Sequence, residues 1–222
     1  MTLRVDRIGR VMVRAPRFVS KKVIERFVQR RVQWIIKRQQ EVKSLAQRFP
    51  IREFIPGESF PLLGRHYRLS IQKVVNLNTA HCVVNGKRLT VMVTAHLPST
   101  QQELVKGAIQ QWYCQSTEKK AATLMSRHAA NLGVSPRKMR VVDQRTRWAS
   151  CSMKGDLRFN WRLSMMPVSV LEYVVVHELC HLNAMNHSDG FWNAVKSILP
   201  DYEKSRGWLR SNGSGLLRAF PS

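Results

Sequence analysis

The sequence predicts an α+β fold in which a metal-site helix is paired with a second long helix beside a mostly antiparallel sheet. A helical pattern of about 30 residues starts at residue 99, and a second, apolar one starts at Pro167 and contains the pattern His-Glu-x-x-His. The sheet is expected because short runs of strand-forming residues alternate with turn signals from residue 60 to 94. A basic helix and a small β region are expected before these elements.

The N-terminal part is expected to form a hairpin followed by the basic helix. Residues 3–5 and 11–13 have strand character, and Gly9 lies in the turn between them. Ser20 is a good N-cap residue, and apolar side chains recur at helical spacing over about 25 residues after it. Lys and Arg occupy most of the other positions, so this face could contact nucleic-acid phosphates or could simply be solvated.

The expected strands of the sheet are residues 60–63, 67–75, 81–84 and 89–94. Asn85-Gly86 lies between the last two of them and is the strongest hairpin signal in the chain. The helix from residue 99 is long enough to be a central helix that packs against the metal-site helix. Between these two helices, residues 139–142 and 156–161 have strand character.

His177, Glu178 and His181 form the motif around which the chain is organised. Histidines four residues apart lie on the same side of a helix, so both imidazoles can reach one metal ion. Glu178 would lie beside the open position of that ion, where a carboxylate can take a proton from water. His187 is the candidate third ligand and leaves one position for water, as in catalytic zinc sites. The alternative is a buried helix whose histidines only pack in the core.

The balance of charge is unusual: 37 Lys and Arg against 14 Asp and Glu give a net charge of +23. Such an excess attracts polyanions, so nucleic acid or nucleotides are possible partners, although a merely solvated basic surface is the alternative. No apolar run is long enough to cross a membrane, and the first residues lack the apolar core of a secretory signal. The four cysteines are scattered and form no Cys-x-x-Cys pair, which fits a reducing compartment. We therefore expect a cytoplasmic protein.

Six stretches of the chain carry a family resemblance: 147–152 (RWASCS), 157–163 (LRFNWRL), 173–181 (YVVVHELCH), 185–188 (MNHS), 191–192 (FW) and 199–202 (LPDY). In sequence and order they resemble the YgjP-like zincin metallopeptidase family, which is related to the SprT and WLM groups. The resemblance implies a zincin-like fold, one Zn²⁺ per chain on His177, His181 and His187, and Glu178 as the general base. Three histidines would also accept other divalent metals, such as cobalt, nickel or manganese.

Several polar residues lie close in sequence to the proposed cleft and are candidates for substrate binding: Arg145, Arg147, Arg158, Asn160 and Arg162. Guanidinium groups bind phosphate or carboxylate through paired hydrogen bonds and can stabilise negative charge that develops during hydrolysis. The arginines could equally form ion pairs within the fold. Asn160 has no assigned role.

We expect a zinc-dependent hydrolase, and by family analogy a metallopeptidase that acts on a peptide or protein. The basic surface suggests a substrate protein that is associated with nucleic acid. A nucleotide phosphohydrolase of the nucleoside triphosphate pyrophosphatase type is the alternative, although Mg²⁺ with several carboxylates is more usual for that chemistry. A nucleic-acid-binding module with a structural zinc is the third possibility. The oligomeric state is left open.

Three segments are predicted along the chain. Residues 1–98 form the basic helix and the β-hairpin region, and residues 99–210 form the zincin-like metallohydrolase domain. Ser188 and Asp201 are expected to start the last two helices of that domain. The segment 211–222 is rich in Gly and Ser and is expected to be a flexible tail.

Overall fold

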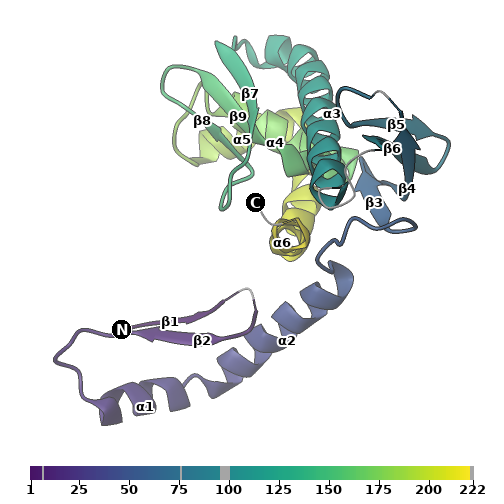
Figure 1. Cartoon of the computed structure of the whole chain (residues 1–222). Helices are drawn as coiled ribbons and strands as arrows, with labels where there is room; N and C mark the ends of the chain where they lie inside the picture. Colours follow the sequence, from purple (N-terminus) through teal and green to yellow (C-terminus); the bar gives the residue numbers. More distant parts are fainter. Residues whose placement is uncertain (7, 76, 96–100, 221–222) are drawn as a thin grey trace. The chain divides into compact units, whose positions relative to one another are not determined.

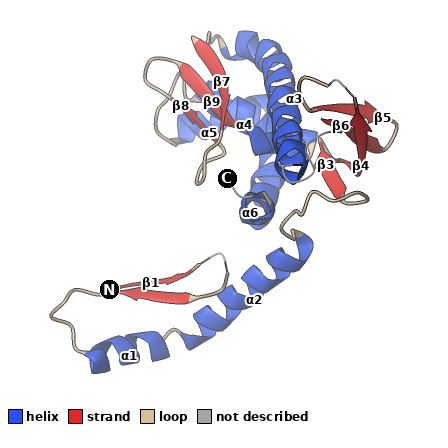
Figure 2. Cartoon of the chain, in the orientation of Figure 1, coloured by secondary structure: helices blue, strands red, loops and turns tan. Residues whose placement is uncertain are grey.

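The computed structural model of the chain describes all residues except 7, 76, 96–100 and 221–222. Helices and small sheets are mixed along the chain, which confirms the predicted α+β class (Figures 1 and 2). The chain forms two compact units: residues 1–51 together with the chain end from Asn212, and Arg52–Ser211. The predicted boundary at residues 98 and 99 lies outside the described residues.

The first unit begins with the predicted hairpin and a broken helix. Strands β1 (Thr2–Val5) and β2 (Val11–Arg14) pair antiparallel. The predicted single helix is two helices, α1 (Lys21–Gln29) and α2 (Val32–Arg48). Arg30 is the C-cap residue of α1, and Arg31 follows it: the Arg31 guanidinium donates to the carbonyl oxygen of Phe27 at 3.2 Å and lies 3.9 Å over the Phe27 ring. Arginine side chains commonly satisfy the last carbonyls of a helix in this way.

The prediction of a flexible tail from residue 211 is wrong for the described residues, because residues 211–219 belong to helix α6 (Tyr202–Ala219). Asn212, Gly213 and Gly215 are buried within the first unit, and Asn212 accepts a hydrogen bond from Arg48 at 2.6 Å. A Cβ atom added to Gly215 would overlap the ring of Phe49. The glycines that suggested a loose tail therefore permit close packing of the helix.

The second unit contains two sheets that both contact the long helix α3 (Gln101–Leu132), which lies between them in the view of Figure 2. The first sheet has the strand order β3-β4-β6-β5 and is mostly antiparallel, as predicted, since only β4 and β6 run parallel. Its strands are β3 (Ser59–Leu62), β4 (Arg65–Val74), β5 (His81–Asn85) and β6 (Arg88–Thr94).

The second sheet has the order β7-β9-β8 and lies next to the metal-site helix. Its strands are β7 (Lys138–Val142), β8 (Ala149–Cys151) and β9 (Asp156–Asn160). The sequence predicted the first and last of these. It missed β8, which has only three residues and is therefore too short to show an alternating pattern.

Helix α4 (Val168–Cys180) carries the histidine motif and packs against α3, as predicted. A 3₁₀ turn, η2 (Trp161–Met165), leads from β9 into it. The fully buried hydroxyl of Thr117 on α3 fixes this turn: it donates to the carbonyl oxygen of Trp161 at 2.7 Å and accepts from the amide of Ser164 at 3.2 Å. Helix α5 (Asp189–Ile198) begins directly after Ser188, also as predicted. Among the described residues, no helix has both the length and the apolar character that crossing a membrane requires.

Candidate metal centre and active site

The candidate metal centre is built at the C-terminal end of α4. His177 lies in the last turn of the helix, and His181 is its C-cap residue. The chain then turns back, with the amides of Asn183 and Ala184 both bonded to the carbonyl oxygen of Cys180. This turn brings His187 to face the helix, so that one short stretch of chain presents all three imidazoles.

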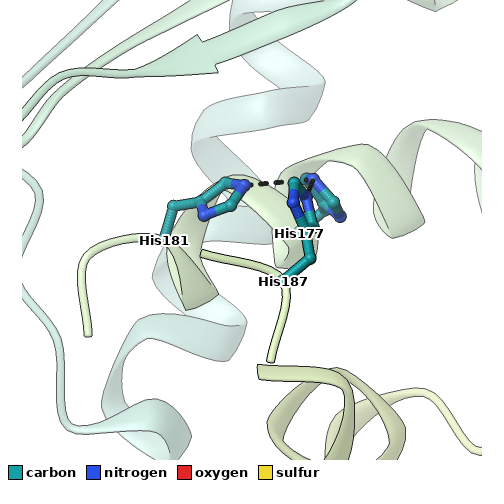
Figure 3. A group of neighbouring side chains, drawn as sticks. All are labelled: His177, His181 and His187. Carbon is teal, nitrogen blue, oxygen red and sulfur yellow. Dashed lines mark hydrogen bonds between the residues drawn. The ribbon is translucent and has the colours of Figure 1, made fainter. Parts of the chain in front are cut away.

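The three imidazoles converge, as Figure 3 shows. Nε2 of His177 lies 3.2 Å from Nε2 of His181 and 3.1 Å from Nε2 of His187. Nδ1 of His181 lies 3.0 Å from the carbonyl oxygen of Ala184. Because that oxygen can only accept, Nδ1 carries the proton and Nε2 directs its lone pair at the other rings. Nitrogens that share one tetrahedral zinc lie roughly 3.3 Å apart, given Zn–N distances of about 2.0–2.1 Å. The cluster therefore fits a divalent metal ion.

The surroundings of His177 and His187 favour the neutral imidazole, which is the form that binds metal. Burial and the neighbouring His181 and His187 lower the pKa of His177 to about 3. The pKa of His187 is also lowered, mainly by burial and then by His181 and Arg206. Phe191 of α5 packs against all three rings, with centroid distances of 4.6 to 4.9 Å, and it is itself buried. An apolar wall therefore closes one side of the cluster.

Glu178 follows His177 in helix α4 and is buried, with only 6% of its surface exposed. Burial raises the pKa of this carboxyl to about 7, although the charge of Arg147 lowers it. A group with a pKa near the working pH is well suited to accept a proton and to return it. The charge of Glu178 in turn contributes to the raised pKa of the Cys151 thiol, after burial, which places β8 close to the carboxylate.

The structure separates the predicted substrate-binding residues into two groups. Arg147 is exposed and acts on the candidate base. Arg145 and Arg158 are exposed as well, and Arg158 points to the face of β9 opposite to the buried side chains beside it in the strand. Arg162 and Asn160 form the second group, since their side chains are buried.

A substrate contact does not fit Asn160 or Arg162, because both hold the loop before β8 in place. The amide of Asn160 donates to the carbonyl oxygens of Gln144 and Arg147 at 2.6 and 3.1 Å. Arg162 forms an ion pair with Asp143 and lies 4.1 Å over the Trp161 ring. Although both residues lie close to the motif in sequence, they support the loop.

Sequence reasoning missed a group of aromatic and basic side chains beside the histidines. Trp192 stacks on His187 and on Tyr202, with ring centroids 5.6 and 5.4 Å apart. Tyr202 stacks in turn on Tyr173, with a centroid distance of 6.1 Å. The guanidinium of Arg206 lies 4.3 Å over Trp192. Tyr173 could have been found, since it precedes His177 by four residues and so shares its helix face. Arg206 comes from α6 and is brought to the site only by tertiary packing.

Three converging imidazoles can hold a divalent metal ion and leave one position for water. The family model described as "YgjP-like, metallopeptidase domain" matches residues 1–212. The chain therefore belongs to the YgjP-like metallopeptidase family, and the resemblance seen in the sequence motifs is confirmed. Membership of a metallopeptidase family implies a divalent metal and hydrolytic chemistry.

Among solved structures, the chain is similar to the metallopeptidase zymogen abylysin of Pyrococcus abyssi, with 22% sequence identity and a TM-score of 0.37. That similarity covers 40% of this chain and 93% of the archaeal one. A search of the curated proteins found no match.

Proposed function

We propose that the protein is a zinc metallopeptidase in which His177, His181 and His187 bind one Zn²⁺ and Glu178 is the general base. The observation that carries this proposal is the convergence of the three imidazoles, together with a buried carboxyl group one residue after His177 whose pKa is about 7. A metal ion bound there supplies Lewis acidity and makes water a nucleophile near neutral pH.

The residues of the chain account for the remaining tasks of hydrolysis. The Glu178 carboxylate accepts the proton of the attacking water and passes it to the leaving amine. Phe191 and Trp192 exclude solvent from one side of the cluster. Arg147 and Arg206 supply positive charge around the cluster. This charge stabilises the negative charge that develops on the attacked carbonyl oxygen.

The edge strand β8 favours a peptide as the substrate. Hydrogen bonds from Asn160 N to Trp148 O and from Ser152 N to Asp156 O join β8 to β9 at both of its ends. In an antiparallel pair such bonds alternate along the strand, so the backbone groups of Ala149 and Cys151 point away from β9. A free strand edge that contacts α4 can pair with an extended peptide.

The composition of the metal cluster also favours a peptidase over a nucleotide phosphohydrolase. Within the part of the chain that the structure describes, the three histidines are the one group of three or more metal-binding side chains, and this group contains no carboxylate. Phosphoanhydride cleavage usually relies on Mg²⁺, which prefers carboxylate and phosphate oxygens.

The substrate class is tested by offering the zinc-loaded protein an unfolded protein and, separately, a panel of nucleoside triphosphates. We expect new peptide termini in the mass spectrum, lost after chelation and restored by one equivalent of zinc. Release of phosphate or pyrophosphate without peptide cleavage would move the reaction to the phosphohydrolase class. Absence of both reactions from a folded, zinc-loaded protein would favour a structural zinc.

A further inference from the structure

The first unit contains a cavity of about 390 Å³ between β1, α2 and the last turns of α6. Its size lies in the range of pockets that bind small ligands. Apolar side chains of β1 and α2 line part of it, together with Trp34, of which 47% is exposed. Three arginines contribute the charged part of the lining: Arg4, Arg38 and Arg218.

The lining attracts anions. Among the described residues of the lining, Asp6 is the one acidic residue. Its carboxylate already accepts hydrogen bonds from the amides of Ile8 and Arg10 and from the Arg10 guanidinium. Of the three arginines, Arg38 is paired with Glu41 at 2.7 Å. The lining therefore carries more basic than acidic side chains, next to an exposed indole ring.

The positive charge of the whole chain is concentrated in the same unit. Residues 1–51 and 212–222 contain 15 Lys and Arg but only three Asp and Glu, whereas the other 160 residues contain 22 and 11. About half of the net charge of +23 therefore lies on less than a third of the chain. The candidate metal centre lies in the other unit, so peptide hydrolysis does not account for this concentration.

We propose that this cavity holds one nucleotide of a single-stranded nucleic acid, with its base on Trp34 and its phosphate near the three arginines. An exposed indole stacks on any base, and guanidinium groups bind phosphate without reading sequence. Bases are accessible for stacking in a single strand but not in a duplex. A free nucleotide offers the same base and phosphate. A strand is favoured because basic residues continue beyond the cavity, along the exposed helix α1.

Binding of a labelled 12-nucleotide single strand to the full-length, zinc-loaded chain tests this proposal. We expect Trp34→Ala to raise the Kd about tenfold, in line with the loss of one stacked base. Phe18→Ala is the matched control, because Phe18 is an aromatic residue of the same unit, 89% exposed and outside the cavity. Trp34→Phe keeps an aromatic face and should restore most of the affinity. In the wild type, binding of the strand should quench the fluorescence of Trp34. Trp34→Phe should remove this part of the quenching.

A second variant keeps the test valid if Trp34→Ala fails to fold. Arg4 is exposed, so Arg4→Gln should fold, raise the Kd and lower the slope of log Kd against log salt by about one. Equal Kd values for Trp34→Ala and Phe18→Ala would overturn the cavity as the binding site. A mononucleotide or a duplex that binds as tightly as the single strand would overturn the assignment of the ligand.

Discussion

At the scale of single residues, the metal site depends on the direction in which each imidazole points. His181 is oriented by its Nδ1 contact with the Ala184 carbonyl, and His177 by burial against Phe191. Sequence spacing predicted that His177 and His181 share a helix face, since that follows from helix geometry alone. It could not predict burial. Asn160 and Arg162 were therefore assigned to the substrate although they support the loop, and Arg206 was missed.

The role of His187 as third ligand leads to a prediction about metal affinity. Its Nε2 lies 3.1 Å from that of His177, so His187→Ala removes one of three converging donors. We expect the affinity for zinc to fall more than about 100-fold, beyond the loss typical of residues that only orient a ligand. Competition with a chromogenic chelator measures this. The exposed His81 of β5 provides the control, and His81→Ala should leave the affinity unchanged.

At the scale of elements, periodicity predicted the long helices and most strands, since patterns over many residues are hard to imitate by chance. Two local details escaped it. The break between α1 and α2 lies at Arg30 and Arg31, where the Arg31 guanidinium binds the carbonyl oxygen of Phe27. Strand β8 is defined by its partner β9 and not by its own three residues. Two buried hydroxyl groups also join α3 to η2: that of Thr117, and that of Ser164, which donates to the carbonyl oxygen of Tyr113 at 3.2 Å.

Thr117→Val should destabilise the second unit by about 1–3 kcal/mol. Valine keeps the shape of threonine, but it leaves the buried Ser164 amide without this acceptor. It also removes one donor from the Trp161 carbonyl, to which the Ser164 hydroxyl still donates at 3.3 Å. Urea unfolding followed by circular dichroism gives the loss. Thr123 is on the same helix, and its hydroxyl donates to Lys119 O at 2.9 Å on the exposed side. If Thr123→Val costs as much as Thr117→Val, the buried network does not fix the turn.

At the scale of the whole molecule, both ends of the chain combine in one compact unit, while the candidate metal centre is confined to the other. Composition instead suggested a flexible C-terminal tail, because Gly and Ser are frequent in flexible segments. The close approach of α6 to Phe49 explains why glycine is needed at position 215. This contact joins residues far apart in the chain, so no local pattern reveals it.

Two glycines of α6 test this packing. Gly215→Ala places a methyl group into the Phe49 ring, so we expect a loss of about 1–3 kcal/mol and faster hydrogen exchange in α2. Gly207→Ala adds the same methyl group where no atom lies within 4 Å, and it should stabilise the helix by about 0.5–1 kcal/mol. Unchanged exchange in α2 for Gly215→Ala would show that the chain end does not dock there.

The most direct test of the account is peptide hydrolysis by Glu178→Gln at one equivalent of zinc per chain. Glutamine keeps the shape of the side chain but cannot accept the proton of water, so kcat should fall by about 10²–10⁴-fold. Zinc content and the unfolding transition should stay those of the wild type, because Glu178 is not among the three ligands. A variant that keeps its zinc and cleaves peptides at the wild-type rate would contradict the assignment of Glu178 as general base.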